Sequence, residues 1–197
     1  MIILVRHGQT VTNARRLLVG RSDPELTPLG ERQARALQPL LADVSQVWSS
    51  PLQRALVTAS IAVPNLAVTL KESFVEVDYG EFDGAPMAAV TPEQWKIFET
   101  DHRHALGGGE SLASVDERVH AELDALLADE SSLLYDNHHH LAIFSHVSPI
   151  KSATTWALGV AGSVAWRTRL DNGSITTIAV RGVTPALVHF NLIPRLD

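Results

Sequence analysis

The sequence predicts a three-layer α/β/α sandwich with a mostly parallel central sheet. Short apolar runs of strand length recur along the chain, and amphipathic stretches of helix length separate them. Such continuous apolar runs are typical of strands that helices cover on both faces of a sheet. Strands that alternate with helices require crossover connections, which favour parallel pairing. Because no internal repeat or linker is found, the 197 residues are expected to form a single domain.

The expected elements follow this alternation along the chain. Strands are predicted at residues 2–5, 46–49, 66–70 and 140–144, with a closing pair at 174–180 and 186–190. Helices are predicted at 92–101, 111–127 and 149–158, and two more begin at Thr27-Pro28 and Ser50-Pro51, where a capping side chain precedes a proline. Residues 71–109 have a looser pattern with several glycines and prolines. We expect this segment to form a lid or wall that determines ligand choice.

The composition is that of an ordinary globular protein, with 45% hydrophobic and 19% charged residues. The absence of cysteine excludes disulfides, thiolate catalysis and cysteine metal sites. A net charge of −6 without any Lys/Arg-rich run argues against a nucleic-acid partner. The apolar run at residues 2–5 is too short for a signal peptide or a membrane span, so we expect a soluble, cytoplasmic protein without a membrane partner.

Charged side chains follow the predicted strands at the edge where open α/β sheets bind their ligands. Arg6 and His7 follow the first strand, Arg54 lies in the first turn of the helix after the second, Glu76 lies in the loop after the third, and His146 follows the fourth. Each of them alone is more simply a hydrogen-bonded structural histidine, a solvated arginine or a surface carboxylate. Their convergence on one edge favours a shared chemical role.

These residue types suit phosphoryl transfer. An imidazole can attack phosphorus and form a covalent intermediate that divides one difficult step into two. Arginine holds phosphoryl oxygens through charge-assisted hydrogen bonds, and Arg54 is expected to gain from free N–H groups at its helix N-terminus. Glu76 can protonate a leaving alkoxide if its surroundings keep it protonated, with Glu81 and Glu110 as rival donors. Gly8 is expected to let the backbone approach a ligand closely.

Several motifs stand in a fixed order around these residues. They are residues 4–10 (LVRHGQT), 49–55 (SSPLQRA), 76–84 (EVDYGEFDG), 108–111 (GGES), 144–146 (FSH) and 172–174 (NGS). Together they resemble the signature motifs of the histidine phosphatase superfamily, which includes the cofactor-dependent phosphoglycerate mutases. The resemblance spans nearly the whole chain and implies a phosphoglycerate mutase-like fold.

By position, the resemblance also implies a role for each residue at this edge. His7 is similar to the nucleophile, His146 to the second histidine of the phosphate pocket, and Glu76 to the proton donor. Arg6 and Arg54 are similar to the phosphate-binding arginines.

Three positions concern the wall of the expected pocket. Asn13 falls where the family often has a polar pocket residue, although capping of the loop backbone explains an asparagine there equally well. Relatives commonly have glycine at the position of Val147, so this β-branched residue is expected to narrow the pocket or to shift its loop. Leu17 stands where many relatives have arginine, so either Arg15 or Arg16 replaces that phosphate contact or the contact is absent.

The resemblance implies a phosphomonoester hydrolase of the histidine acid phosphatase type that acts on a small phosphorylated substrate through a phosphohistidine. The alternative is a phosphomutase, which returns the phosphoryl group to a second hydroxyl of the same molecule. The compact chain favours hydrolysis, since the family's mutases typically carry additional sequence that closes the site against water. A catalytically weak sensor of a phosphorylated ligand is less favoured, because binding alone does not require both a nucleophile and an acid.

No cofactor and no metal are expected, because no cluster of metal ligands is found at the strand ends. Metal binding by the His138-His139-His140 run is also disfavoured, since consecutive residues that enter a strand point to opposite faces. The sequence names neither the substrate nor the oligomeric state, and a homodimer is among the options.

Overall fold

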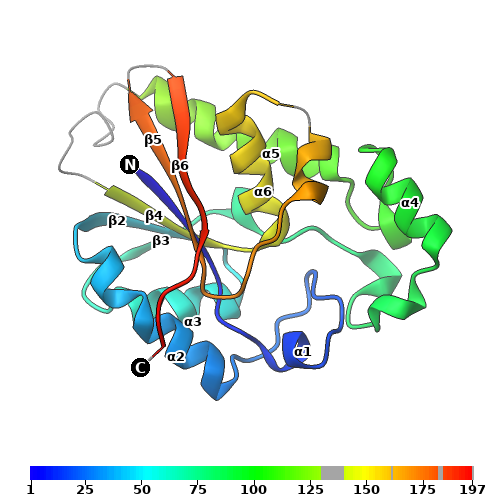
Figure 1. Cartoon of the computed structure of the whole chain (residues 1–197), viewed down its shortest axis with the longest axis horizontal. Coiled ribbons are helices and arrows are strands. Elements are labelled where there is room, and N and C mark those ends of the chain that lie inside the picture. The colour runs from blue at the N-terminus through cyan, green and yellow to red at the C-terminus, as the bar shows by residue number, and fades with distance from the viewer. Residues whose placement is uncertain (130–139, 161, 182–183, 197) are drawn as a thin grey trace.

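The computed structural model describes residues 1–129, 140–160, 162–181 and 184–196. Its centre is a six-stranded sheet with the strand order β3-β2-β4-β1-β5-β6 (Figure 1). The strands are β1 (Ile2–Arg6), β2 (Val44–Ser49), β3 (Val68–Leu70), β4 (His140–Ser145), β5 (Ile175–Arg181) and β6 (Thr184–Leu192). The first four strands pair in parallel, and β5 and β6 are antiparallel to their neighbours. The prediction of a mostly parallel sheet is confirmed.

Alternate residues of β1 face two separate apolar layers, as expected when both faces of a sheet are covered. Ile2 and Leu4 pack with residues of α5 (Leu112–Ala128) and α6 (Val147–Leu158). Ile3 and Val5 pack on the other face, next to residues of α3 (Gln53–Ala62) and the chain that follows α2 (Pro28–Ala36). These four apolar side chains of β1 are buried. The three-layer prediction is therefore confirmed.

The two predicted helix starts have different outcomes. Thr27 caps α2 as expected, because its Oγ1 accepts from Gly30 N–H at 3.1 Å and Pro28 occupies the first turn. The predicted start at Ser50-Pro51 is wrong, since α3 begins at Gln53. The reason is that Ser50 still belongs to the sheet edge, where its N–H donates to Phe144 O on β4 at 2.9 Å.

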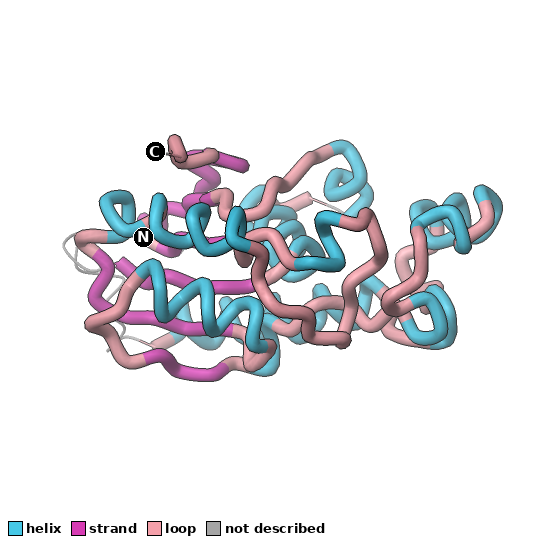
Figure 2. Tube along the Cα trace, turned by 90° about the horizontal axis from the view of Figure 1, so that it is seen from below, coloured by secondary structure: helices cyan, strands magenta, loops and turns pink. Residues whose placement is uncertain are grey.

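Residues 71–109 form turns, four short 3₁₀ helices and one α-helix, α4 (Pro92–Thr100), which lies well to one side of the sheet (Figures 1 and 2). A separate apolar cluster, formed by Leu18, Val90, Phe98 and Leu106, holds this segment to the loop that follows β1. Gly80 is required here, because its φ of +54° is left-handed and a Cβ would lie 2.0 Å from the backbone oxygen of Gly107.

The remaining elements are short. Helix α1 comprises Val11–Ala14, and 3₁₀ helices comprise Gln38–Leu41, Glu72–Phe74, Gly80–Phe82, Met87–Ala89, Leu106–Gly108 and Gly162–Arg167. Within the part of the chain that the structure describes, no helix is long and apolar enough to cross a membrane. Of the expected histidine run, only His140 is among the described residues.

Candidate active site

His7 lies at the carboxyl edge of the sheet, directly after β1. Its backbone N–H donates to Ser145 O on β4 at 3.0 Å, and its side chain is only 3% exposed. The ring Nδ1 lies 2.7 Å from Gly8 O. Because a carbonyl oxygen only accepts hydrogen bonds, Nδ1 carries the proton and Nε2 keeps a lone pair. His7 lines a cavity with about 860 Å³ of empty space, part of it open to solvent, so Nε2 is the nitrogen suited to nucleophilic attack.

Gly8 joins the loop after β1 to the neighbouring helices. Its N–H donates to Thr58 Oγ1 at 3.0 Å, and Thr58 Oγ1 donates to Arg54 O at 2.7 Å. A Cβ at Gly8 would lie 2.4 Å from Gly30 O. Glycine is therefore required by the close approach of α2. The expectation that it serves the approach of a ligand is replaced by this packing reason.

The guanidinium of Arg54 is 1% exposed and is held by the protein on several sides. Nη1 donates to Ser22 O at 2.6 Å and Nη2 donates to Gly20 O at 2.7 Å. Nε donates to His146 Nδ1 at 3.2 Å. These bonds fix the plane and position of the guanidinium, and Arg54 is not among the residues that line the cavity beside His7.

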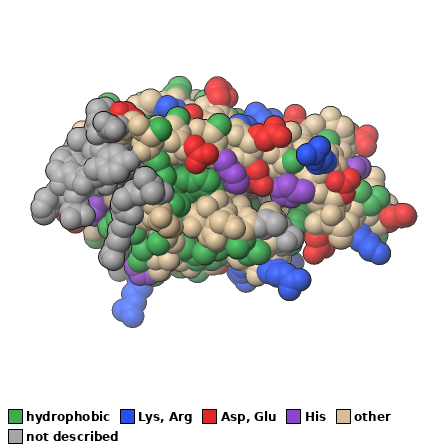
Figure 3. All heavy atoms as spheres, turned by 90° about the horizontal axis from the view of Figure 1, so that it is seen from above, with side chains coloured by type: hydrophobic (Ala, Val, Ile, Leu, Met, Phe, Trp, Pro, Cys, Tyr) green, Lys and Arg blue, Asp and Glu red, His purple; other side chains and the backbone are tan. Residues whose placement is uncertain are grey.

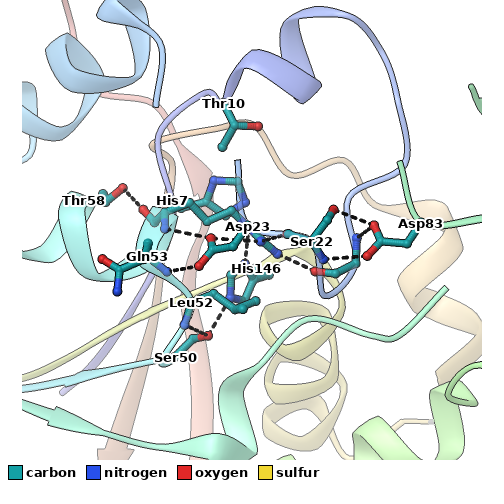
Figure 4. A network of polar contacts seen from close by, with 12 residues as sticks. His7, Thr10, Ser22, Asp23, Ser50, Leu52, Gln53, Thr58, Asp83 and His146 are labelled. Atoms are coloured by element: carbon teal, nitrogen blue, oxygen red, sulfur yellow. Dashed lines mark hydrogen bonds and ion pairs between the residues drawn. The ribbon is translucent and has the colours of Figure 1, made fainter. Parts of the chain in front are cut away.

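Asp23 caps α3 from a distant part of the chain. Its carboxylate accepts from the backbone N–H groups of Gln53 and Arg54 (Figure 4). One carboxylate oxygen also lies 3.5 Å from Arg54 Nη1. The expectation that free N–H groups of this helix attract an anion is therefore wrong, because a carboxylate of the protein already occupies them.

His146 is fully buried, and its ring centroid lies 5.1 Å from that of His7. Nε2 lies 2.8 Å from Ser50 Oγ, while Nδ1 accepts from Arg54. Both ring nitrogens are thus engaged within the protein. His146 positions Arg54 in this arrangement, and a direct contact with phosphate would require one of these bonds to be exchanged.

Arg6 lines the cavity beside His7. Nη1 donates to Leu170 O at 2.6 Å. Its Nε is buried and has no hydrogen-bond partner among the described residues. A buried cationic donor without a partner is unfavourable, so an anion in the cavity beside His7 would satisfy it.

Glu76 is 4% exposed and lies in the wall of the same cavity. Oε1 accepts from Val77 N–H at 2.9 Å and from Ser148 N–H at 3.1 Å. Oε2 accepts from Val147 N–H at 3.0 Å. Glu76 therefore caps α6, as Asp23 caps α3. Oε2 accepts only one of these bonds and keeps a second lone pair that can carry a proton.

The two rival carboxylates are placed differently. Glu81 is exposed and does not line the cavity. Glu110 is held by Arg118 at 2.8 Å and by Arg21 at 3.1 Å. Of the three carboxylates considered from the sequence, only Glu76 lies in the wall beside His7.

The family model of the histidine phosphatase superfamily (branch 1) matches residues 2–193. The chain belongs to this superfamily. This match confirms the resemblance that the motifs indicated, and it covers nearly the whole chain.

Three similar proteins allow a closer comparison of this histidine phosphatase within its superfamily. It is 34% identical over 183 residues to a bifunctional protein of Mycobacterium tuberculosis. The aligned residues make up 89% of this chain but 49% of that protein, so the chain spans about half the length of this relative. It is 30% identical over 203 residues to phosphoserine phosphatase 1 of Hydrogenobacter thermophilus, covering 99% and 93% of the two chains. A crystal structure of a mutant phosphoserine phosphatase from Entamoeba histolytica with phosphoserine superposes with a TM-score of 0.85 at 28% identity, covering 96% and 95%.

Electrostatics keep both histidines of this histidine phosphatase neutral. Burial, with the charges of Arg54 and Arg6 next, lowers the pKa of His7 well below its usual value. Burial also lowers the pKa of His146, followed by the effects of Arg54 and His7. Burial lowers the pKa of Arg6 to about 10, so its guanidinium is still charged at neutral pH. Two neutral imidazoles thus lie beside fixed positive charge.

Asn13 combines the two roles that the sequence left open. Its Oδ1 accepts from Thr10 N–H at 3.2 Å and Thr10 Oγ1 at 3.0 Å, which forms the capping box of α1. It also accepts from Asn172 Nδ2 at 3.2 Å, and both asparagines line the cavity. Asn13 is therefore a capping residue that also borders the site.

The cavity wall includes Leu17 and Val147, the two positions where the family resemblance led us to expect a different residue. Arg16 lines the cavity, whereas Arg15 is exposed and does not. Of the two alternatives left open by the sequence, Arg16 is thus the one near the site.

Sequence reasoning missed three residues of the site. Asn172 donates to His7 O at 3.2 Å, Tyr79 lines the cavity, and Asp23 caps α3. Asn172 and Tyr79 lie inside motifs that the family shares, so the motifs contained a signal for them. The partner of Asp23 depends on the path of a long loop and has no local signal.

Proposed function

We propose that this histidine phosphatase hydrolyses a small phosphorylated metabolite through a phosphohistidine on His7. The observation that carries the proposal is the tautomer of His7: Gly8 O holds the proton on Nδ1, so Nε2 keeps a free lone pair on a side chain that lines the cavity. Arg6, with its buried donor that lacks a partner, lies on the wall of the same cavity.

In the first step, the Nε2 lone pair of His7 attacks phosphorus as the bond from phosphorus to the ester oxygen breaks. Glu76 gives its proton to the departing alkoxide, which leaves as an alcohol. Arg6 holds the phosphoryl oxygens, and the fixed charge of Arg54 helps to offset the charge of the transition state. In the second step, water attacks phosphorus, Glu76 takes one of its protons, and the bond from nitrogen to phosphorus breaks to release phosphate.

In this proposal, residues 71–109 supply the part of the cavity wall that determines which substrate binds. Glu76, Tyr79 and Met87 from this segment border the active-site cavity. Relatives at about 30% identity include phosphoserine phosphatases and probable phosphoglycerate mutases, and both kinds of name support a small phosphorylated metabolite as the substrate class. The individual substrate is best found with a panel of phosphomonoesters.

Rapid quenching with a ³²P-labelled substrate tests the mechanism. The wild-type enzyme should give a phosphoprotein that is labile in acid and stable in base, and His7→Ala should give none. Label that survives in His7→Ala, or that resides on serine, contradicts the proposal. The proposed chemistry uses no metal, so activity should persist after exhaustive EDTA treatment; loss of activity that Mg²⁺ or Zn²⁺ restores would refute that part.

A further inference from the structure

Arg16 occupies a backbone position that favours glycine. It directly follows the C-cap of α1, and its φ of +58° is in the left-handed region. Its N–H donates to Asn13 O at 3.0 Å, and the N–H of Leu17 donates to Thr12 O at 3.2 Å, which is the Schellman pattern of helix ends. Glycine is the usual residue at this position, because a side chain is strained there. The helix end therefore explains the left-handed backbone but not the choice of arginine.

The side chain of Arg16 has no partner within the part of the chain that the structure describes. It is exposed and forms neither a hydrogen bond nor an ion pair with a described residue, yet it lines the cavity beside His7. The carboxylate of Glu76, which lies in the same wall, is instead held by three backbone N–H groups. A strained residue whose side chain borders an active site indicates a function for that side chain.

Arg16 lies at the opposite end of the cavity from the buried nucleophile. His7, which contacts phosphorus in the proposed reaction, is 3% exposed, whereas Arg16 is exposed at the mouth. Arg6 and Arg16 are the two Lys/Arg side chains among the described residues of this wall. Arg6 has a buried Nε without a partner, which suits the phosphoryl group. Arg16 is thus a second cation, left for a part of the substrate that lies nearer to solvent.

The backbone beside Arg16 is fastened to the segment that forms the rest of the mouth. Leu17 and Pro86 form an isolated antiparallel bridge. The residue after Leu17 adds two backbone hydrogen bonds to the same segment, both of 2.9 Å. Arg16 and Met87 flank the bridge on one side, and both line the cavity. This connection holds the start of the Arg16 side chain in place, so less entropy is lost when it binds a ligand.

The protein as a whole does not attract anions. Its net charge is −6, and acidic and basic side chains are interspersed on the face that Figure 3 shows. Much of the cavity wall is apolar, with Leu17, Val19, Met87 and Val147 among its residues. A preference for a further negative charge on the substrate must therefore come from a local cation. Arginine suits this role, because its planar fork forms charge-assisted hydrogen bonds with both oxygens of a carboxylate.

We propose that Arg16 is a specificity-determining residue that binds a carboxylate on the leaving group of the substrate. The proposal rests on the proposed phosphatase function and names the substrate class, a phosphomonoester of a small hydroxy acid. Arg6 and the charge of Arg54 serve the phosphoryl group, whereas Arg16 contacts the leaving group at a distance from phosphorus. Because the carboxylate does not change during the reaction, this contact stabilises the bound substrate and the transition state alike. Its loss should therefore raise KM more than it lowers kcat.

The test uses two pairs of esters that differ at the carboxylate of the leaving group. They are 3-phosphoglycerate with glycerol 3-phosphate, and phosphoserine with phosphoethanolamine. In the wild-type enzyme, kcat/KM should be higher for the carboxylate ester in at least one pair. In Arg16→Gln this preference should fall by about tenfold, mainly through KM, because a charge-assisted contact is lost. Arg16→Lys restores the charge without the fork and should recover about threefold of the loss.

Arg15→Gln is the matched control, since it makes the same change of charge one residue earlier. Arg15 is exposed and does not line the cavity, so its replacement should leave the preference within about twofold of the wild type. A preference that survives Arg16→Gln, or that falls equally in Arg15→Gln, overturns the proposal. Equal losses on both members of a pair in Arg16→Gln also overturn it, because they would place Arg16 at the phosphoryl group.

Arg16→Gly separates the function of the side chain from its structural effect. This variant removes the strained side chain, so its midpoint of urea unfolding should be at or above that of the wild type, while the carboxylate preference falls as in Arg16→Gln. A lower midpoint would show that the side chain holds the loop and would overturn the proposal. A wild-type enzyme that hydrolyses p-nitrophenyl phosphate but neither carboxylate ester, or that prefers the ester without a carboxylate in both pairs, would do the same. Failure to hydrolyse any of the five esters in a His7-dependent reaction would instead count against the phosphatase function.

Discussion

Arg54 Nε donates to His146 Nδ1 across the bottom of the site, at 3.2 Å. Because the guanidinium can only donate, Nδ1 of His146 is unprotonated, and Nε2 carries the proton that it donates to Ser50 Oγ at 2.8 Å. If His146 were protonated, its Nδ1–H would face the N–H of Arg54 Nε, and two donors cannot form this hydrogen bond. The position of Arg54 therefore depends on a neutral His146.

This relationship predicts different effects for two substitutions of His146. His146→Ala removes the acceptor and should lower kcat/KM for p-nitrophenyl phosphate by about 10²- to 10³-fold, the usual effect of disturbing one charge-stabilising group. His146→Asn supplies a side-chain oxygen near the position of Nδ1 and should recover at least about tenfold of that loss. Equal activities of the two variants would show that His146 acts on phosphate directly rather than through Arg54.

The lowered pKa values of His7 and His146 predict how stability depends on pH. In the unfolded chain both titrate near 6.5, whereas burial keeps them neutral in the folded protein to a much lower pH. The stabilisation is complete above pH 6.5 and is lost as pH falls below it, because only the unfolded chain takes up these protons. Each histidine should contribute a slope of up to about 1.4 kcal/mol per pH unit.

Urea unfolding at pH 7.5, 6.0 and 5.0 measures this slope. His146→Asn removes one of the two groups, so its free energy of unfolding should fall less steeply between pH 6.0 and 5.0 than that of the wild type. Parallel curves for the two proteins would contradict the assignment. Carboxylates titrate mostly at lower pH and contribute equally to both proteins.

Glu76 is predicted to act as the acid toward leaving groups that need a proton. Glu76→Gln keeps the shape but removes the proton, so alkyl phosphates should slow by about 10²- to 10⁴-fold. p-Nitrophenyl phosphate leaves as a stable anion and should slow much less. Glu81→Gln is the matched control and should change neither rate, since Glu81 is exposed and does not line the cavity. Equal losses on both esters in Glu76→Gln would assign to Glu76 a role in holding α6.

The sequence predicted the parts of this site that depend on local pattern. Each strand was expected within a few residues of its observed position, so the residues that follow the strands, such as His7 and His146, could be placed at one edge. The caps of α3 and α6 could not be predicted, because Asp23 and Glu76 reach them through loops whose paths depend on tertiary packing.

Hydrolysis should outrun mutase transfer in this enzyme. A mutase must keep the phosphohistidine dry while the intermediate reorients, but the cavity beside His7 is partly open to solvent, and exposed residues such as Arg16 and Met87 lie on its wall. Water at about 55 M competes with a bound hydroxyl unless positioning gives that hydroxyl an effective molarity of about 10⁵ M or more. The measurement supplies 3-phosphoglycerate with a small amount of 2,3-bisphosphoglycerate and follows inorganic phosphate and 2-phosphoglycerate together. Phosphate release from this or other esters without isomer formation is the expected result. Rapid formation of 2-phosphoglycerate with negligible phosphate release would make the mutase reading correct, because the bound hydroxyl would then have outcompeted water at the phosphohistidine.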